Sequence, residues 1–403
     1  MSMVSEKKVT KLSEDLCPVC NSKGLRVFFE ILDVPVSCNI IWRSREAARN
    51  CTRGNIKLAF CPVCSFIMNL DFESNRLEYT QAYGNPLHFS PYFQDYAHLL
   101  AERLVEQYNL HNKDIIEIGC GDGYFLQLLC QLGNNRGVGF DPAYVEQEKQ
   151  SALRDRVKFV QDFYSERYRD YQGDLIVCRQ TLEHIHNPKV FLKMLRRAIG
   201  NRLDTRVLFE VPNATQIFRR LFVWDIIYEH CSYFTSLSLA HTFSSSGFRV
   251  CELTEEFEGQ FLCVHARPGD QAAPYSDYQH LGEVNRIASD TASFAANYQS
   301  KVETCRYKLE QIEGRGQLAV VWGAGSKGVT FLNVLKDLHI EYVVDINPRK
   351  QGMYVPGTGQ QIVQPKFLRD YQPDVIVVMN PIYTREIQQL TKRLGLTTKL
   401  MSA

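Results

Sequence analysis

The sequence lacks any uninterrupted apolar run approaching the roughly 20 residues that a helix needs to span a bilayer. Its first residues, Met-Ser-Met-Val-Ser-Glu-Lys-Lys, also lack the apolar core of a signal peptide. Charge of one sign is not in excess: the formal net charge is +1, which gives no support to a nucleic-acid partner. Short-period repeats and low-complexity tracts are absent as well. We therefore expect a cytoplasmic protein whose partner is neither a membrane nor a nucleic acid.

Thirteen cysteines are present, and most stand singly in apolar stretches, as Cys120, Cys130, Cys178 and Cys263 do. This usage fits reduced, buried thiols better than a disulfide framework. Of the 403 residues, 45% are hydrophobic and 23% are charged, which is ordinary for a globular protein. A chain of this length exceeds one compact core and predicts two or three domains.

Two Cys-Pro-Val-Cys sequences depart from this scatter. In each, the two-residue gap lets a tight turn direct both thiolates at one ion, and two such turns complete a tetrahedral shell of four sulfurs. The alternatives are buried free thiols or redox pairs, although a redox pair would normally open a helix beside a strand–helix–strand unit. We expect a structural Zn²⁺ with no position left for a substrate, held by Cys17, Cys20, Cys61 and Cys64.

Strands and helices alternate through the middle of the chain and again near its end. This alternation predicts an α/β fold, in which a parallel sheet carries helices on both faces. A more polar helical stretch over 279–312 precedes a second, smaller α/β domain. We expect strands over 114–118, 137–140, 174–178, 206–210, 318–322, 342–345 and 374–379, and helices over 92–108, 124–132, 188–199 and 329–338.

A glycine-rich loop, Glu117-Ile118-Gly119-Cys120-Gly121-Asp122-Gly123, follows the first of these strands and opens a helix. Its three glycines let the backbone approach a ligand closely, as in dinucleotide-binding folds. No Walker lysine-serine pair follows the loop, so a nucleoside triphosphate is not expected.

Three acids around the loop define the ligand further. Glu117 precedes the first glycine, and Asp141 ends the next strand, where its carboxylate is placed to accept from both ribose hydroxyls. Asp162 falls at the end of a third strand, in position to accept from an adenine amine. An acid before the first glycine suits an ammonium group better than a pyrophosphate, which argues against the alternative of a nicotinamide-binding Rossmann domain.

This pattern resembles motif I and the ribose acid of class I S-adenosylmethionine-dependent methyltransferases, with Gly139-Phe140-Asp141-Pro142 downstream of the loop. The segment from Arg179 to Ile185 looks like the one that closes the cofactor pocket in that family. The resemblance implies that S-adenosylmethionine is the cofactor and that it is bound by Glu117, Gly119, Gly121, Gly123, Asp141, Asp162 and Arg179.

Aromatic, acidic and imidazole groups gather in the segment Trp224–Phe234. A carbon nucleophile needs a base to form an enolate, and the ordinary pKa of a histidine suits His230 to that role. Glu229 is placed to orient or assist it, and Tyr228 to donate to a developing oxyanion. The alternative is that His230 and Tyr233 are hydrogen-bonded core aromatics in a substrate lid.

Taken together, the cysteine pairs, the class I core, this segment and the C-terminal domain resemble the nucleotide-sugar C-methyltransferases over nearly the whole chain. That family carries a Tyr-His-Glu-His segment whose last histidine is the proposed base for a 4-keto sugar. By position Glu229 and His230 carry over, and His184 matches a pocket histidine. Two positions depart: Ile227 stands where the family has its tyrosine, and Glu258–Leu262 replaces Gly-Gly-Ser-x-Arg.

A second glycine loop, Gly323-Ala324-Gly325-Ser326-Lys327-Gly328, opens a helix in the C-terminal domain, with Asp345 at the next strand's end. This region is similar to the C-terminal domain of the same family, where it helps to form the substrate face. Lys327 and the loop amides are placed to hold a phosphate of a nucleotide-linked acceptor. The alternative is a degenerate structural domain. Asn380, after the last strong strand, is expected to face the same cleft.

The combined prediction is an enzyme with a zinc-binding N-terminal lobe (1–90), a methyltransferase core with a substrate lid (91–275), a helical connector (276–312) and a Rossmann-like domain (313–403). It methylates carbon next to a ketone of a nucleotide-linked sugar or related natural-product intermediate. The alternatives are an O- or N-methyltransferase of a secondary metabolite, and a cofactor-binding scaffold or regulator. The acceptor is expected to be a small molecule, and both a monomer and a dimer remain open.

Overall fold

The computed structural model describes residues 16–40, 42–77, 86–145, 153, 155–269 and 277–403. The N-terminal stretch Met-Ser-Met-Val-Ser-Glu-Lys-Lys, in which no signal peptide is expected, lies outside these ranges. Within them, no helix combines the length and the apolar character that crossing a membrane requires.

The N-terminal lobe is built on a four-stranded antiparallel sheet in the order β1-β2-β3-β9. Three of its strands are consecutive: β1 (Arg26–Pro35), β2 (Arg53–Phe60) and β3 (Ile67–Asn69). The fourth, β9 (Ser232–Tyr233), comes from much later in the chain and begins two residues after His230. The short helix α1 (Arg45–Arg49) lies between β1 and β2.

A seven-stranded sheet forms the centre, in the order β10-β11-β8-β7-β4-β5-β6. The five strands from β8 to β6 are parallel to one another, and β11 pairs antiparallel with both β8 and β10. The parallel strands occupy the expected positions, whereas the β10–β11 pair is an addition to the prediction. The strands are β4 (Asp114–Ile118), β5 (Arg136–Phe140), β6 (Val157–Val160), β7 (Leu175–Arg179), β8 (Arg206–Pro212), β10 (Phe248–Glu256) and β11 (Phe261–Pro268).

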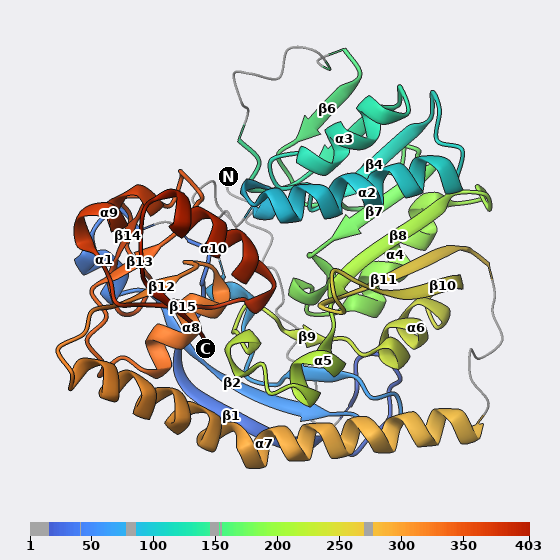
Figure 1. Cartoon of the computed structure of the whole chain (residues 1–403). Helices are drawn as coiled ribbons and strands as arrows, with labels where there is room; N and C mark the ends of the chain where they lie inside the picture. The colour runs from blue at the N-terminus through green and yellow to red at the C-terminus, as the bar shows by residue number, and fades with distance from the viewer. Residues whose placement is uncertain (1–15, 41, 78–85, 146–152, 154, 270–276) are drawn as a thin grey trace, which may run out of the picture.

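Helices cover both faces of this sheet, because side chains of successive strand residues point to opposite sides. In β4, Ile115 packs with α2 (Pro91–Gln107) and α3 (Tyr124–Leu132), whereas Ile116 packs with α4 (Pro188–Ile199) and α6 (Ser236–Ser244). Figure 1 shows α2 and α3 on one side of the sheet. The short α5 (Ala214–Arg219) follows β8. The helices cover the two faces of the sheet but not the carboxyl ends of its parallel strands. In open α/β sheets, ligands bind at these carboxyl ends.

The C-terminal domain holds a five-stranded parallel sheet in the order β14-β13-β12-β15-β16. Its strand order places β12 and its glycine loop at the centre, as β4 is at the centre of the five parallel strands in the larger sheet. The elements are β12 (Ala319–Trp322), α8 (Ser326–Val334), β13 (Tyr342–Val344), β14 (Gln361–Val363), α9 (Leu368–Tyr371), β15 (Val375–Val378), α10 (Thr384–Arg393) and β16 (Lys399–Ser402).

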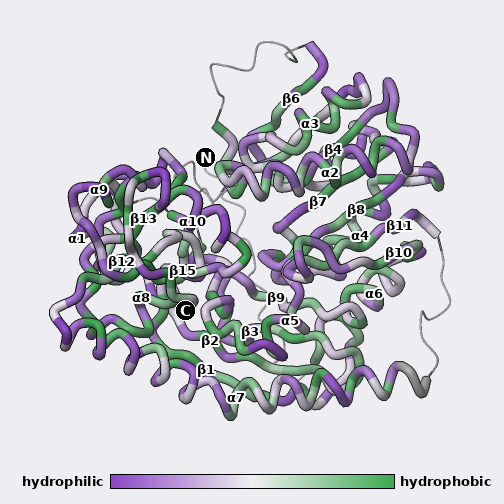
Figure 2. Tube along the Cα trace, in the orientation of Figure 1, coloured by the Kyte–Doolittle hydropathy of each residue, from purple (hydrophilic) through white to green (hydrophobic). Residues whose placement is uncertain are grey.

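The helix α7 (Asp277–Glu313) runs beneath the N-terminal lobe and joins the two larger parts (Figure 1). Its buried residues recur at helical spacing, and Phe294 packs edge-on against Phe29 of β1 with ring centroids 5.2 Å apart. Figure 2 shows hydrophobic and hydrophilic stretches alternating along α7, as expected for a helix with one buried side. The helix predicted over 279–312 is thus observed, and it shares one hydrophobic core with β1, β2 and α8.

Candidate functional site

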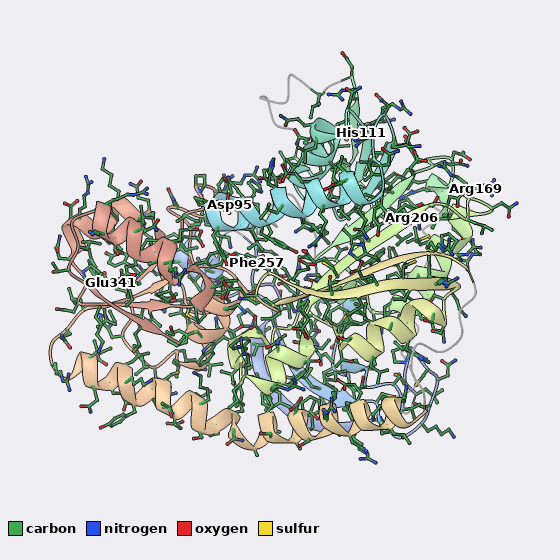
Figure 3. All side chains as sticks on the ribbon, turned by 45° about the vertical axis from the view of Figure 1, so that its right-hand side comes forward. Asp95, His111, Arg169, Arg206, Phe257 and Glu341 are labelled. Carbon is green, nitrogen blue, oxygen red and sulfur yellow. The ribbon has the colours of Figure 1, made fainter. Side chains whose placement is uncertain are left out.

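A cavity of about 620 Å³ opens where the parallel strands of the large sheet end. Its wall combines the glycine loop, the segment after β7, Asn39 of the N-terminal lobe, and Lys327 and Asn380 of the C-terminal domain. Phe257 lies at the junction between the large sheet and the C-terminal domain (Figure 3), 6.1 Å from the ring of Tyr383. All three parts of the chain therefore meet at one site.

The glycine loop is shaped as the sequence predicted. Gly119 has φ +71°, and a Cβ there would lie 2.0 Å from Oγ1 of Thr181, so no larger residue fits. Gly123 has φ +81° at the start of α3, where a Cβ would meet the ring of Phe159 at 2.3 Å. The amide of Gly121 donates to Oδ2 of Asp141 at 2.8 Å. These contacts fix the conformation of the loop, which lines the cavity.

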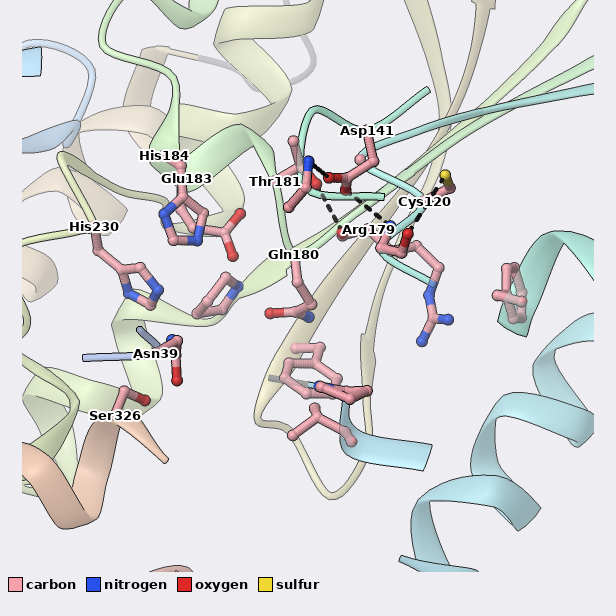
Figure 4. A pocket seen from close by; sticks show the side chains of 18 of the residues that line it. Asn39, Cys120, Asp141, Arg179, Gln180, Thr181, Glu183, His184, His230 and Ser326 are labelled. Atoms are coloured by element: carbon pink, nitrogen blue, oxygen red, sulfur yellow. Dashed lines mark hydrogen bonds between the residues drawn. The ribbon is translucent and has the colours of Figure 1, made fainter. Parts of the chain in front are cut away.

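Asp141 and Glu117 both line the cavity at this end. Oδ1 of Asp141 accepts from the amide of Ala143 at 2.8 Å, which fixes the carboxylate and leaves further lone pairs for a ligand (Figure 4). Oε2 of Glu117 is buried and has no hydrogen-bond partner among the described residues. Burial raises the pKa of Glu117 to about 8, while the nearby Arg179 guanidinium acts against this rise. A cationic donor would satisfy this orphaned oxygen.

Arg179 lies in the wall, but its charge is already matched. Its guanidinium forms an ion pair with Glu210 at 3.0 Å and lies 4.1 Å from the ring centroid of Phe125. Tyr96 also donates to Glu210. Because Glu210 already balances its charge, Arg179 forms part of the cavity wall and is not a free cation for the ligand.

Asp162 lines the cavity, yet its carboxylate accepts from Arg167 and from the hydroxyl of Tyr168. These partners hold the pKa of Asp162 below its usual range. The predicted contact with an adenine amine would have to be shared with them, so Asp162 is the weakest of the predicted cofactor residues.

Two histidines face each other at the other end of the cavity. The rings of His184 and His230 are edge to face with centroids 5.0 Å apart, and both line the cavity (Figure 4). Nδ1 of His230 is buried and has no hydrogen-bond partner among the described residues. Burial holds the pKa of His230 well below 6.5, with further repulsion from His184 and Lys327. His230 is therefore a neutral imidazole that can accept a proton.

Glu229 does not face the cavity, although it adjoins His230 in the chain. Its carboxylate accepts from the amide of Cys38 at 3.1 Å and from Nδ2 of Asn39 at 3.2 Å. Oδ1 of Asn39 is left buried and unpartnered among the described residues, on the cavity wall. Glu229 is thus placed to orient Asn39. No sequence pattern pointed to Asn39, which stands alone in an irregular stretch.

The structure corrects the placement predicted for Tyr228. Its hydroxyl accepts from the amide of Glu73 at 2.9 Å, and its ring packs on Gly54, where a Cβ would lie 2.5 Å away. Tyr228 is 1% exposed and does not line the cavity, whereas Ile227 does. The side chain is committed to the core of the N-terminal lobe and cannot donate to a bound acceptor.

The C-terminal domain contributes cations and amides. Lys327 forms an ion pair with Asp225, and Nε2 of Gln260 donates to Oδ1 of Asn380 at 3.2 Å. Both pairs lie in the cavity wall, as predicted for Lys327 and Asn380. The second glycine loop also bonds to the acid at the end of the next strand, since the amide of Ala324 donates to Oδ2 of Asp345 at 2.8 Å.

The two cysteine pairs meet although forty residues separate them. The Sγ atoms of Cys17 and Cys64 are 3.6 Å apart, and those of Cys20 and Cys61 are 3.5 Å apart. All four sulfurs lie within 4.8 Å of one another. A Zn–S bond of about 2.3 Å places tetrahedral sulfurs about 3.8 Å apart, so the four thiols fit one zinc ion.

Two family models match this chain. Residues 89–253 match a methyltransferase domain, and residues 261–398 match a C-methyltransferase C-terminal domain. The C-methyltransferase NovU of Streptomyces niveus is 25% identical over 305 residues, which span 72% of this chain and 71% of NovU.

Two of the solved structures that resemble the chain each cover less than half of its length. The 1,6-didemethyltoxoflavin-N1-methyltransferase of Burkholderia thailandensis is 19% identical over 45% of this chain and 82% of that one, with a TM-score of 0.34. The magnesium protoporphyrin IX methyltransferase of Synechocystis PCC 6803 is 14% identical over 44% of this chain and 84% of that one, with a TM-score of 0.35.

Proposed function

Since the chain is a class I S-adenosylmethionine-dependent methyltransferase that resembles C-methyltransferases, we propose that it methylates a carbon next to a ketone. The acceptor is a small molecule, a nucleotide-linked sugar or a related natural-product intermediate. The observation that carries this proposal is the unpartnered, buried Nδ1 of His230 in the wall of the cofactor cavity. A neutral imidazole in this position is suited to remove a proton from carbon.

The cofactor end of the cavity fits S-adenosylmethionine by its donors and acceptors. The orphaned Oε2 of Glu117 suits the ammonium group, and Asp141 suits the ribose hydroxyls. When bound, the cofactor supplies an electrophilic methyl group. Gly119 and Gly121 allow the close approach, and Arg179 and Asp162 shape the surrounding wall.

Replacing Asp141 with alanine is expected to raise the Kd of S-adenosylmethionine by about 10–100-fold, because hydrogen bonds to a charged group contribute about 1.5–3 kcal/mol. The substitution also removes the acceptor that holds Gly121. Isothermal titration calorimetry measures the change. Asp114→Ala serves as the control, since Asp114 starts β4 and pairs with Arg136 away from the cavity. Equal affinities for Asp141→Ala and wild type would remove Asp141 from the binding site.

The C-terminal domain supports a nucleotide-linked acceptor. Lys327 lies in the first turn of α8 beside the cavity, where a phosphate can compete with Asp225 for its ammonium group. The match of residues 261–398 to a C-methyltransferase C-terminal domain agrees with a role on the acceptor side.

Lys327→Met should raise KM for a nucleotide-linked acceptor by about tenfold or more, since charge-assisted hydrogen bonds contribute about 1.5–3 kcal/mol. KM for S-adenosylmethionine and kcat at saturation should change little. Lys336→Met is a matched control on the exposed surface. Steady-state kinetics at several acceptor concentrations gives both constants, and an unchanged acceptor KM would assign the Lys327–Asp225 pair to structure alone.

A labelled acceptor tests the reaction itself. A nucleoside-diphosphate-linked 4-keto deoxysugar that carries deuterium on each carbon beside the ketone is incubated with the enzyme and S-adenosylmethionine. Carbon methylation requires loss of one deuterium and a new C–CH₃ signal by NMR. A product that keeps all of the deuterium and carries the methyl group on oxygen or nitrogen would reject carbon methylation. It would support the second candidate, an O- or N-methyltransferase in which His230 takes a proton from a hydroxyl or amine.

We further propose that Cys17, Cys20, Cys61 and Cys64 hold a structural zinc ion. The four converging sulfurs support this assignment. All four positions are supplied by the protein, so the ion would stabilise the fold and take no part in catalysis. The division into a zinc-binding lobe, a core, a connector and a Rossmann-like domain is part of the same proposal.

A further inference from the structure

Enolate formation needs a hydrogen-bond donor at the ketone oxygen as well as a base at the carbon. Tyr228 cannot serve, because its hydroxyl is held by Glu73 in the N-terminal lobe. Resting on the carbon methylation proposed above, we propose that Glu183 is a catalytic residue whose protonated carboxyl group donates a hydrogen bond to the acceptor's ketone oxygen.

The position of Glu183 suits this role. Its side chain is 2% exposed, it lines the cavity, and its Oε2 has no hydrogen-bond partner among the described residues. One carboxyl oxygen and one ring nitrogen each of His184 and His230 all lie within 4.8 Å of one another. Figure 4 shows the carboxyl group beside the ring of His184, with His230 across the same space. An acceptor between them would present its carbon to His230 and its oxygen to Glu183.

Local structure holds Glu183 in place. It belongs to the short 3-10 helix Leu182–His184, which follows β7 at the open edge of the sheet. The thiol of Cys231 donates to the carbonyl of Glu183 at 3.3 Å and ties this turn to the segment that carries His230. The base and the proposed donor are therefore anchored to each other.

The surroundings of Glu183 favour its neutral form. Burial, with additional repulsion from Glu210, raises its pKa to about 8, and its own backbone amide acts against the rise. The other titratable groups that face it are the imidazoles of His184 and His230 and the thiols of Cys178 and Cys231. Both imidazoles have pKa values below 6.5 because they are buried, so they bring no positive charge at neutral pH. A neutral carboxyl group is a donor, whereas a carboxylate is not.

The proton-transfer step balances without another reactant. The bond between the acceptor carbon and its hydrogen breaks, and the proton passes to Nδ1 of His230. The electron pair forms the carbon–carbon double bond of the enolate, and the carbonyl pair moves to oxygen, which accepts from Glu183. His230 later loses its proton to solvent.

Comparison of Glu183→Gln with Glu183→Ala tests the donor role. Glutamine keeps an N–H donor at every pH, so this variant should retain at least about a tenth of kcat, whereas alanine should lose about 10²–10³-fold. Wild-type kcat should fall about tenfold per pH unit above about 8, because the donor is lost as the carboxyl group ionises. Glu183→Gln should show no such fall.

The readout is kcat at saturating S-adenosylmethionine and acceptor between pH 6.5 and pH 9.5, with cofactor binding by calorimetry as the check on folding. Asp114→Asn is the control, since this carboxylate pairs with Arg136 outside the cavity, and it should keep the fall near pH 8. The proposal is overturned if Glu183→Gln keeps the wild-type pH profile, if it is as slow as Glu183→Ala, or if activity needs an added divalent cation. The deuterium experiment on wild type tests carbon methylation separately.

Discussion

Replacing His230 with alanine is expected to lower kcat by about 10²–10⁴-fold, the range that a positioned acid–base group contributes. The reason is geometric: the partly buried His230 lines the cavity, and its buried Nδ1 has no hydrogen-bond partner among the described residues. The affinity for S-adenosylmethionine should stay near that of wild type, because the cofactor residues lie at the other end of the site. Single-turnover kinetics and calorimetry separate the two effects.

His186→Ala is the matched control for this prediction. His186 is close to His184 in sequence, yet its ring stacks on Phe72 with centroids 5.5 Å apart, and it does not line the cavity. Its loss should leave kcat within a few-fold of wild type. If His230→Ala turned over as fast as His186→Ala, the base would have to be another group.

The second large effect is expected from the cysteine cluster. Cys64→Ser should reduce the zinc content from one ion per chain to none and should destabilise the N-terminal lobe, since structural zinc binding contributes about 10–16 kcal/mol in small zinc peptides. The cluster packs against α4 and α6, and Lys189 and His280 donate to the carbonyls of Val19 and Val63 at 2.6 Å. Loss of the ion should therefore disturb the acceptor side of the cavity.

Metal analysis by mass spectrometry and thermal unfolding measure these changes. Cys251→Ser is the control, because Cys251 is exposed and distant in sequence from both pairs. It should keep one zinc ion and the wild-type Tm. A metal-free wild-type protein with an unchanged Tm after chelator treatment would contradict the zinc assignment.

The sequence predicted the geometry at the glycine-loop end of the cavity, because its signals are local, and the cofactor contacts assigned there stay predictions. Glu117 and the glycines are adjacent to a recognisable strand, and the structure places Asp141 on the amide of Gly121 as the strand order implies. The convergence of the four cysteine sulfurs could also be predicted, since the two-residue gap within each pair is a local feature of the sequence. For Asp162 the sequence predicted the position at the end of a strand but not the hydrogen bonds that its carboxylate accepts from Arg167 and Tyr168.

The acceptor half could not be predicted to the same degree, because distant segments build it. The sequence pattern predicted Tyr228, Glu229 and His230 together at the cavity. In the structure, β9, which follows this segment, pairs with β3 in the sheet of the N-terminal lobe. Tyr228 and Glu229 then turn toward that lobe, and Asn39 is brought to the cavity. Such contacts leave no period or spacing in the sequence.

The two ends of the cavity are closed by contacts of very different sequence separation. The bond between Gly121 and Asp141 closes a loop of 20 residues, whereas that between Cys38 and Glu229 spans 191. Closing the longer loop costs more chain entropy and is slower. A growing or refolding chain should thus form its S-adenosylmethionine-binding loop first. Methyl transfer should become possible only after the segment around Cys38 has packed against the segment around Glu229.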